Sequence, residues 1–148
     1  MAGVGFRRIL VVCTGNICRS PIAEVLFKQR LAEVELAVVE SAGIGALVGA
    51  PADPHAVTVT SELGYDLAAH RGRQLDLELA GRFELVLVME NHQKAWIEQR
   101  YPVLRGRVHL LGRWLGEEIA DPYREPIERF RAARLQIERA VDSWIEKL

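Results

Sequence analysis

The sequence predicts an α/β fold, a doubly wound parallel sheet with helices on both of its faces. Strand-like and helix-like segments alternate along the 148 residues, an order that favours parallel strands joined by helices. Two strand-like segments, 6–12 and 84–89, contain continuous apolar runs, which indicate strands buried on both sides. No internal repeat, low-complexity tract or linker interrupts the pattern, so we expect a single domain over residues 1–148.

The chain contains four strand-like and four helix-like segments. In chain order they are a strand at 6–12, a helix at 23–34, a strand at 36–41, a helix at 53–64, a strand at 84–89, a helix at 91–101, a strand at 107–111 and a helix from 126 to the end. Loops are expected at 43–52 and 112–125.

Residue types at the helix ends support these assignments. Ser20-Pro21 is typical of a helix start, with serine as the N-cap and proline in the first position. Asp53-Pro54 begins the second helix, and Gly64 ends it. The last helix is amphipathic because its apolar side chains recur at steps of three and four residues: Ile127, Phe130, Ile137, Val141, Trp144, Ile145 and Leu148.

Composition and charge exclude several classes of partner. The formal net charge is −1 and the isoelectric point is about 6.4, which give no basic surface for nucleic acid or an anionic membrane. The apolar run near the N-terminus is shorter than a signal-peptide core, and no segment reaches the roughly 20 apolar residues of a membrane helix. We therefore expect a cytoplasmic protein with reduced thiols and no membrane insertion.

Both cysteines lie in one short loop, VVCTGNICRSP, at residues 11–21. A disulfide framework spreads its cysteines along the chain, and a metal site needs more ligands than two thiols. A tight loop between a strand and a helix directs successive backbone N–H groups into one concavity that fits a tetrahedral anion. Gly15 and Asn16 tolerate the left-handed backbone that such a loop needs.

The side chains of this loop suit phosphate chemistry. The helix N-terminus favours an anion, and Arg19 offers a planar fork that matches two phosphoryl oxygens. A Cys13 thiolate at the base of the loop is placed to attack phosphorus. The alternative is a small buried cysteine that ends a strand, followed by a surface arginine that starts a helix. The strand before the loop, the glycine and asparagine within it and the helix start after it favour a phosphate-binding loop.

Asp121-Pro122-Tyr123, in the loop before the last helix, is the second candidate. A phenolate leaving group needs a proton, and a carboxylic acid that faces the phosphate-binding loop could supply it. Tyr123 could line the same pocket. Alone, however, an Asp-Pro pair is most often a turn, and an exposed loop tyrosine is ordinary.

Two further residues have alternative interpretations. Cys18 is either an inert thiol at a helix start or a disulfide partner of Cys13 under oxidation, which would protect the nucleophile from overoxidation. His70, in AHRGRQ, either forms a hydrogen bond with the loop or is a solvated or core histidine.

The chain resembles the low-molecular-weight protein tyrosine phosphatases over essentially its whole length. The motifs that carry the resemblance are VVCTGNICRSPIAE, SAGIGALVGAPADP, the helix at 56–64, HRGRQL, ELVLVME and ADPY. The loop and the Asp-Pro-Tyr motif together are specific for this family, and neither motif alone would suffice to indicate it. Within the family, the sequence is most similar to the bacterial branch associated with exopolysaccharide or capsule export, whose members dephosphorylate a cognate autophosphorylating tyrosine kinase.

The resemblance implies a catalytic role for three residues. Cys13 is the nucleophile that forms a cysteinyl-phosphate intermediate. Arg19 clamps the phosphoryl oxygens in the ground and transition states. Asp121 protonates the leaving tyrosine oxygen and then acts as the base for the hydrolytic water. No metal and no cofactor are implied, and the sheet is expected to have four strands.

The resemblance also implies supporting roles. Ser20 is the hydroxyl that stabilises the thiolate, and Asn16 holds the loop in shape within a network that includes Ser41 and His70. The remaining loop and pocket positions are Thr14, Gly15, Ile17, Cys18, Leu47 and Tyr123. We expect a monomer that acts on a phosphotyrosine protein, namely a bacterial tyrosine kinase.

The sequence departs from many relatives at two positions. After the second strand it has Ala46-Leu47-Val48 in place of an aromatic residue, and Arg124 follows Asp-Pro-Tyr in place of a second tyrosine. The chemistry is left intact, but one wall of the phosphotyrosine slot becomes aliphatic and less able to stack on a ring. These departures bear on substrate preference.

Two other functions compete with this interpretation. An arsenate reductase can share the fold and the loop, but its thiol relay needs cysteines beyond the two that this chain contains. A non-catalytic phosphotyrosine-binding module would keep the loop for affinity alone. Inactive relatives usually lose the cysteine, the arginine or the acid, and this chain retains all three.

Overall fold

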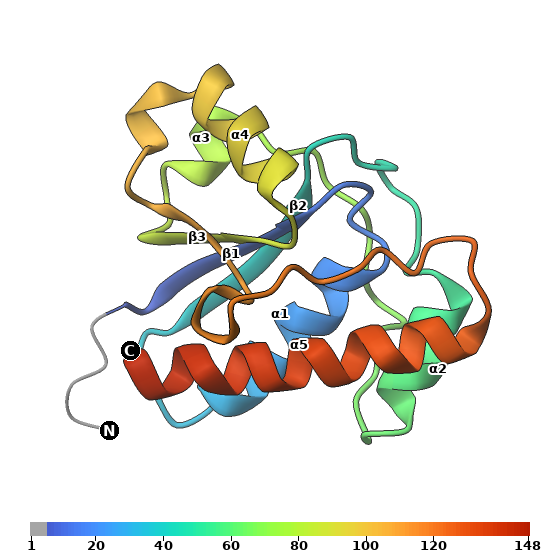
Figure 1. Cartoon of the computed structure of the whole chain (residues 1–148). Coiled ribbons are helices and arrows are strands. Elements are labelled where there is room, and N and C mark those ends of the chain that lie inside the picture. The colour runs from blue at the N-terminus through green and yellow to red at the C-terminus, as the bar shows by residue number, and fades with distance from the viewer. Residues whose placement is uncertain (1–5) are drawn as a thin grey trace.

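The computed structural model describes residues 6–148, which form a four-stranded sheet and five α-helices (Figure 1). The elements are β1 (Arg8–Cys13), α1 (Arg19–Arg30), β2 (Val38–Gly43), α2 (Pro54–Ser61), α3 (Leu77–Ala80), β3 (Leu85–Val88), α4 (Asn91–Arg100), β4 (Val108–Leu110) and α5 (Ile127–Lys147). All neighbouring strands pair in parallel, in the order β2-β1-β3-β4. The expected doubly wound α/β fold is confirmed.

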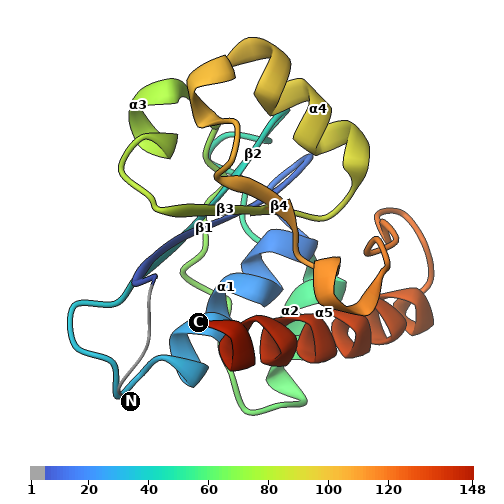
Figure 2. The ribbon, with the colours of Figure 1, turned by 60° about the vertical axis from the view of Figure 1, so that its left-hand side comes forward.

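The helices cover both faces of the sheet. Helices α1, α2 and α5 lie on one face, and α3 and α4 lie on the other (Figures 1 and 2). β1 alternates between the two layers: Ile9 and Val11 pack against the α1 side, whereas Leu10 and Val12 pack against the α4 side, all fully buried. Burial on both sides is the reason for the continuous apolar run in this strand.

The strand order reverses at β1. The chain leaves β1 for β2 on one side and later returns to β3 on the other, so β1 is central and its carboxyl end lies at the topological switch point. Ligands of open α/β sheets bind at such points. Cys13 is the last residue of β1, opposite Gly43 at the end of β2, and the loop at 14–18 fills this end of the sheet.

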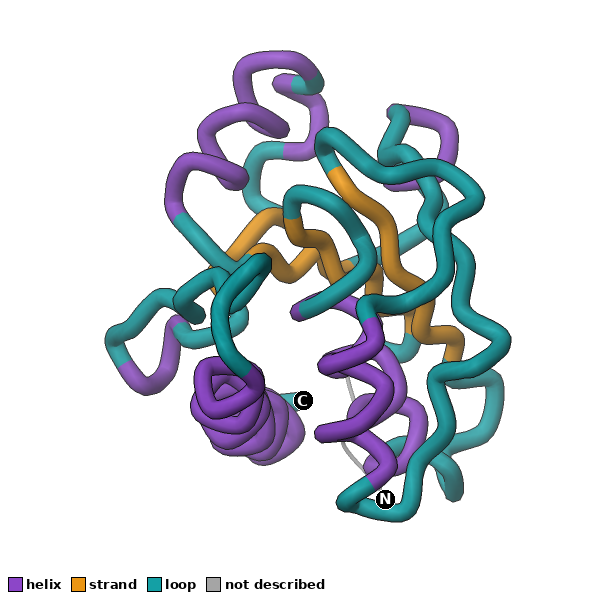
Figure 3. Tube along the Cα trace, turned by 90° about the vertical axis from the view of Figure 1, so that its right-hand side faces the viewer, coloured by secondary structure: helices purple, strands orange, loops and turns teal. Residues whose placement is uncertain are grey.

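The two longest helices pack side by side beneath this switch point. Figure 3 shows α5 end-on beside α1, with the sheet above both. The buried apolar residues of α5 have the expected three- and four-residue spacing, and they include Phe130, Ile137, Val141 and Trp144. No helix within residues 6–148 is long and apolar enough to cross a membrane.

Helix α1 begins differently from the prediction. It starts at Arg19 with Cys18 in the N-cap position, and Cys18 forms no side-chain capping bond. Ser20 lies inside the first turn, so its expected N-cap role is wrong. The physical reason is a competing partner, because the Ser20 hydroxyl contacts the Cys13 thiol instead of a helix N–H group.

Several element ends are also shifted from their predicted positions. Helix α1 ends at Arg30 rather than at 34, since a turn around Leu36, at φ 65°, separates it from β2. β2 therefore runs two residues later than expected, and α2 ends at Ser61 before a turn to Gly64. The four-residue helix α3 was not predicted, because about one turn is too short to show a helical spacing of apolar residues.

Candidate active site

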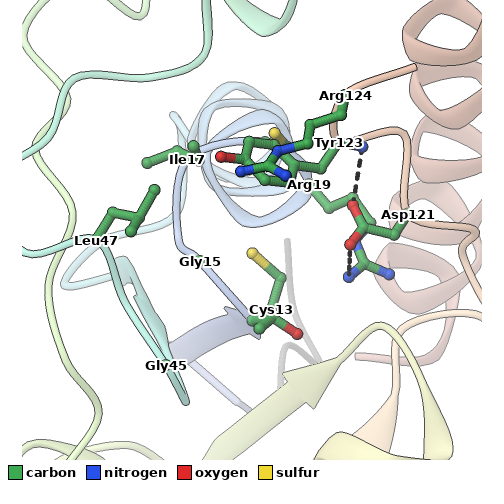
Figure 4. A pocket seen from close by; sticks show the side chains of 11 residues that line it. Cys13, Gly15, Ile17, Arg19, Gly45, Leu47, Asp121, Tyr123 and Arg124 are labelled. Atoms are coloured by element: carbon green, nitrogen blue, oxygen red, sulfur yellow. Dashed lines mark hydrogen bonds and ion pairs between the residues drawn. The ribbon is translucent and has the colours of Figure 1, made fainter.

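A pocket of about 290 Å³ opens at the carboxyl end of β1 (Figure 4). The loop at 13–19 forms its floor, and the segment after β2 and the segment before α5 form its sides. Its lining residues are Cys13, Thr14, Gly15, Ile17, Cys18, Arg19, Gly45, Leu47, Asp121, Tyr123 and Arg124. The structure thus brings the expected loop, acid and rim residues into one cavity.

Cys13 lies on the floor of this pocket. Its side chain is 2% exposed, and its Sγ atom is 3.0 Å from the Ser20 Oγ atom. A hydroxyl at this distance can donate to a thiolate and so stabilise the charged form. Cys13 and its hydrogen-bond partner come from the end of β1 and the first turn of α1, seven residues apart.

Asn16 holds the loop from behind and is fully buried. Its backbone is in the left-handed region, at φ 59°, which asparagine tolerates better than most residues. Its side-chain amide donates to Ser20 at 2.8 Å and to Ser41 at 3.0 Å, and its Oδ1 atom accepts the Arg73 N–H at 2.8 Å. His70 Nε2 lies 2.6 Å from the Asn16 carbonyl oxygen. His70 therefore contacts the loop backbone.

Two neighbours extend this support. The Ser41 hydroxyl donates to Glu24 at 2.6 Å, which continues the network from β2 to α1. Gly43 lies directly against the loop, and a Cβ atom at this position would collide with the Thr14 carbonyl oxygen. The end of β2 must therefore be glycine for the loop to pack against it.

Arg19 is 1% exposed, so almost all of its charge is removed from water. One terminal nitrogen donates to Glu90 at 2.6 Å and to the Ile119 carbonyl oxygen at 2.7 Å, and the other lies 3.5 Å from Asp121. The Nε atom has no hydrogen-bond partner within the described residues. A buried donor without a partner is rare in a folded protein and fits a site that receives an anionic ligand.

Three features of this site were not predicted. Glu90 fixes the Arg19 guanidinium. Buried Gln93 accepts the N–H groups of Met89 and Glu90 through Oε1 and donates to the Thr14 hydroxyl at 3.1 Å, which joins the start of α4 to the loop. The Arg73 N–H bond to Asn16 is the third. The Glu90-x-x-Gln93 spacing after a buried strand is a capping-box signal in the sequence, but nothing local relates it to the loop.

Asp121 approaches from the opposite side of the pocket. Its side chain is 45% exposed, and its Oδ1 atom accepts the Tyr123 N–H at 3.1 Å. Figure 4 shows Leu47 and Ile17 on one side of the pocket and Asp121 on the other. An exposed carboxyl group at the mouth can exchange protons with both water and a bound leaving group.

Cys18 is buried beside the pocket, and burial raises the pKa of its thiol well above the usual range. The negative charge of Asp53 acts in the same direction. Cys18 is therefore protonated at neutral pH and unsuited to act as the nucleophile. Within residues 6–148, no group of three acidic, histidine or cysteine side chains is arranged to hold a metal ion.

Comparison with known proteins gives a consistent result. Residues 8–148 match the family described as low molecular weight phosphotyrosine protein phosphatase. The probable low molecular weight protein-tyrosine-phosphatase EpsP of Ralstonia nicotianae is 47% identical over 142 residues, covering 96% of this chain and 96% of EpsP. The low molecular weight protein-tyrosine-phosphatase Wzb of Escherichia coli (strain K12) is 44% identical, covering 97% of this chain and 96% of Wzb.

A solved structure agrees closely with this fold. Vibrio vulnificus Wzb in complex with benzylphosphonate has a TM-score of 0.92 and 40% sequence identity, and the match covers 97% of this chain and 100% of that chain.

Proposed function

The chain belongs to the low molecular weight phosphotyrosine protein phosphatase family, and on this premise we propose that it hydrolyses phosphotyrosine through a cysteinyl-phosphate intermediate on Cys13. It is a protein-tyrosine-phosphatase, as its relatives are. One observation carries the mechanism. The same pocket contains a thiol on its floor and a buried guanidinium whose Nε–H has no partner among the described residues.

The first step transfers the phosphoryl group to the enzyme. The Cys13 thiolate attacks phosphorus, an S–P bond forms and the P–O bond to the tyrosine breaks. Arg19 and the backbone N–H groups of the loop bind the phosphoryl oxygens. Asp121, in its carboxylic acid form, donates its proton to the leaving oxygen, so tyrosine leaves as the neutral phenol.

The second step releases phosphate. Asp121, now a carboxylate, accepts a proton from a water molecule that attacks phosphorus, and the S–P bond breaks. Inorganic phosphate and the Cys13 thiolate are the products. Ser20 stabilises the thiolate in both steps, and Asn16, Ser41 and His70 keep the loop in position.

The substrate ring occupies the pocket between Leu47 and Tyr123. The benzylphosphonate complex of Vibrio vulnificus Wzb, which combines an aromatic ring with a phosphorus oxyanion, supports this arrangement. We infer that the phosphoprotein is an autophosphorylated bacterial tyrosine kinase linked to exopolysaccharide export, that the enzyme acts as a monomer and that it works in the cytoplasm. The resemblance of the loop and ADPY motifs to that bacterial branch supports the choice of substrate.

Hydrolysis of para-nitrophenyl phosphate with a chelator present tests the chemistry. The wild-type protein should release nitrophenol, and Cys13→Ser should show no detectable turnover, because a hydroxyl is far less nucleophilic than a thiolate at neutral pH. Cys13→Ser should still bind phosphate. Binding without turnover by the folded wild-type protein would contradict the proposal and favour a phosphotyrosine-binding module.

A further inference from the structure

One charged residue of the pocket has no part in the proposed chemistry. Arg19 and Asp121 act on the phosphoryl and leaving groups, and Arg124 is the third charged residue that lines the cavity. Within residues 6–148, its exposed guanidinium forms neither an ion pair nor a side-chain hydrogen bond. By contrast, Arg131 and Arg134 of α5 pair with an acidic side chain. An unpaired cation therefore remains at the pocket.

The local backbone fixes the position of this cation. The Glu125 N–H donates to the Pro122 carbonyl oxygen at 2.9 Å and closes a four-residue turn in which Arg124 has φ 65°. This turn position favours glycine or asparagine, so a side chain is kept here against the backbone preference. The turn places the guanidinium carbon 5.2 Å from the centre of the Tyr123 ring, within the range of a cation–π contact.

The cation lies at the mouth of the pocket. Arg124 lines the pocket and is exposed, and in Figure 4 its side chain overlaps that of Tyr123, apart from Cys13 on the floor. A phosphotyrosine whose phosphorus is next to Cys13 extends its ring past Tyr123, so the residues before and after it in the substrate chain lie at this mouth. A fixed cation there has the chemistry to bind a carboxylate.

We propose that Arg124 is a specificity-determining residue that binds the carboxylate of an acidic side chain adjacent to phosphotyrosine in the substrate chain. This inference rests on the proposed function and adds a substrate class to it. The contact does not change between the bound substrate and the transition state, so it lowers KM and leaves kcat unaffected. Because the pair is exposed, its effect is about 2- to 5-fold and decreases with salt.

Two phosphotyrosine peptides test this inference. They differ only in having Glu or Gln on both sides of the phosphotyrosine, and the quantity measured is the ratio of their kcat/KM values for each enzyme variant. Because each variant is its own reference, a general change in activity cancels. Arg124→Asn removes the charge with a residue that tolerates the left-handed turn position, and Arg124→Glu reverses the charge. Arg129→Asn is the matched control, since Arg129 lines a neighbouring groove and has no ion pair within the described residues.

The wild-type protein and Arg129→Asn should prefer the Glu peptide, through KM, and the preference should fall as salt is raised. Arg124→Asn should lose the preference, and Arg124→Glu should prefer the Gln peptide. Equal ratios for all four proteins would overturn the inference while leaving the phosphatase proposal intact. Equal loss of preference in Arg124→Asn and Arg129→Asn would assign the effect to the general charge of this surface and would also overturn it. Absence of turnover with either peptide would count against the proposed function itself.

Discussion

The two sides of the pocket are held in different ways. On the loop side, Asn16 is fully buried and every polar atom of its side chain has a hydrogen-bond partner. On the other side, the Asp121 side chain is 45% exposed, and its contacts are a 3.5 Å ion pair with Arg19 and one backbone N–H group. The loop side is therefore part of the folded core, whereas the Asp121 side is a surface segment placed over it.

We infer that the two sides of the pocket have different roles in the proposed mechanism. The phosphoryl group needs fixed donors around a thiolate, and fixed donors require buried, fully satisfied hydrogen bonds. The leaving group needs an acid that exchanges protons with water between the two steps, and such an acid must stay accessible. Substitutions in the buried hydrogen-bond network of the loop side should therefore lower both stability and activity, whereas substitution of Asp121 should lower activity alone.

Asp121→Asn should produce the largest loss of activity without loss of stability. Turnover of tyrosyl phosphate should fall by about 10²–10⁴-fold, because the variant lacks the general acid of the proposed mechanism. The free energy of unfolding should change by less than about 0.5 kcal/mol, since the side chain is half exposed. Steady-state kinetics with a series of aryl phosphates measures the loss of turnover, and urea denaturation measures the change in the free energy of unfolding. The loss should shrink for good leaving groups, and an equal loss for all of them would argue against the acid role.

Asn16→Ala should lower both the activity and the free energy of unfolding. It leaves buried partners without their hydrogen bonds and places alanine in the left-handed region, so the free energy of unfolding should fall by about 2–4 kcal/mol. Asn91→Ala is the matched control, because Asn91 is exposed at the start of α4 and its side chain makes no hydrogen bond within the described residues. If urea denaturation showed the same loss of stability in both variants, the buried Asn16 network would not be what holds the loop.

Cys18→Ser should have its main effect only after oxidation. Peroxide converts the Cys13 thiolate to a sulfenic acid, which condenses with the Cys18 thiol to a disulfide and water. Burial raises the Cys18 pKa, so the thiol is mostly protonated at neutral pH and closure of the disulfide should become faster as pH rises. Recovery of activity with added thiol, after mild peroxide, should be high in the wild-type protein and low in Cys18→Ser. Equal recovery would rule out this protective role.

The sequence predicted the site best where the residues that contact one another are close together in the chain. Cys13, Asn16 and Ser20 lie within eight positions of one another, and the strand, glycine and helix signals around them are local. The alternating elements also predicted the layers of the fold. The prediction of Ser20 as the N-cap was wrong for an equally local reason. Its hydroxyl had two possible kinds of partner, and it contacts the Cys13 thiol rather than a helix N–H group.

The contacts that the sequence did not predict span long separations. Glu90 is 71 residues from Arg19, and Arg73 is 57 residues from Asn16, so no spacing rule relates them. Glu90 reaches Arg19 because it follows β3, which pairs with β1. Arg73 reaches Asn16 because its neighbour Gln74 forms a bridge with Gly43 at the end of β2. The residue types alone made Asp121 a candidate acid, but an Asp-Pro pair in a loop is also an ordinary turn signal, and the resemblance to a family was needed to choose between the two.

The central claim, a covalent intermediate on Cys13, is tested most directly by partition of the phosphoryl group between water and an added alcohol. Aryl phosphates with different leaving groups are hydrolysed in the presence of the alcohol, and the ratio of alkyl phosphate to inorganic phosphate is measured for each. If all substrates form the same cysteinyl phosphate, the ratio is identical for every leaving group. A ratio that changes with the leaving group would mean that water attacks the substrate directly, and the cysteinyl-phosphate mechanism would be wrong.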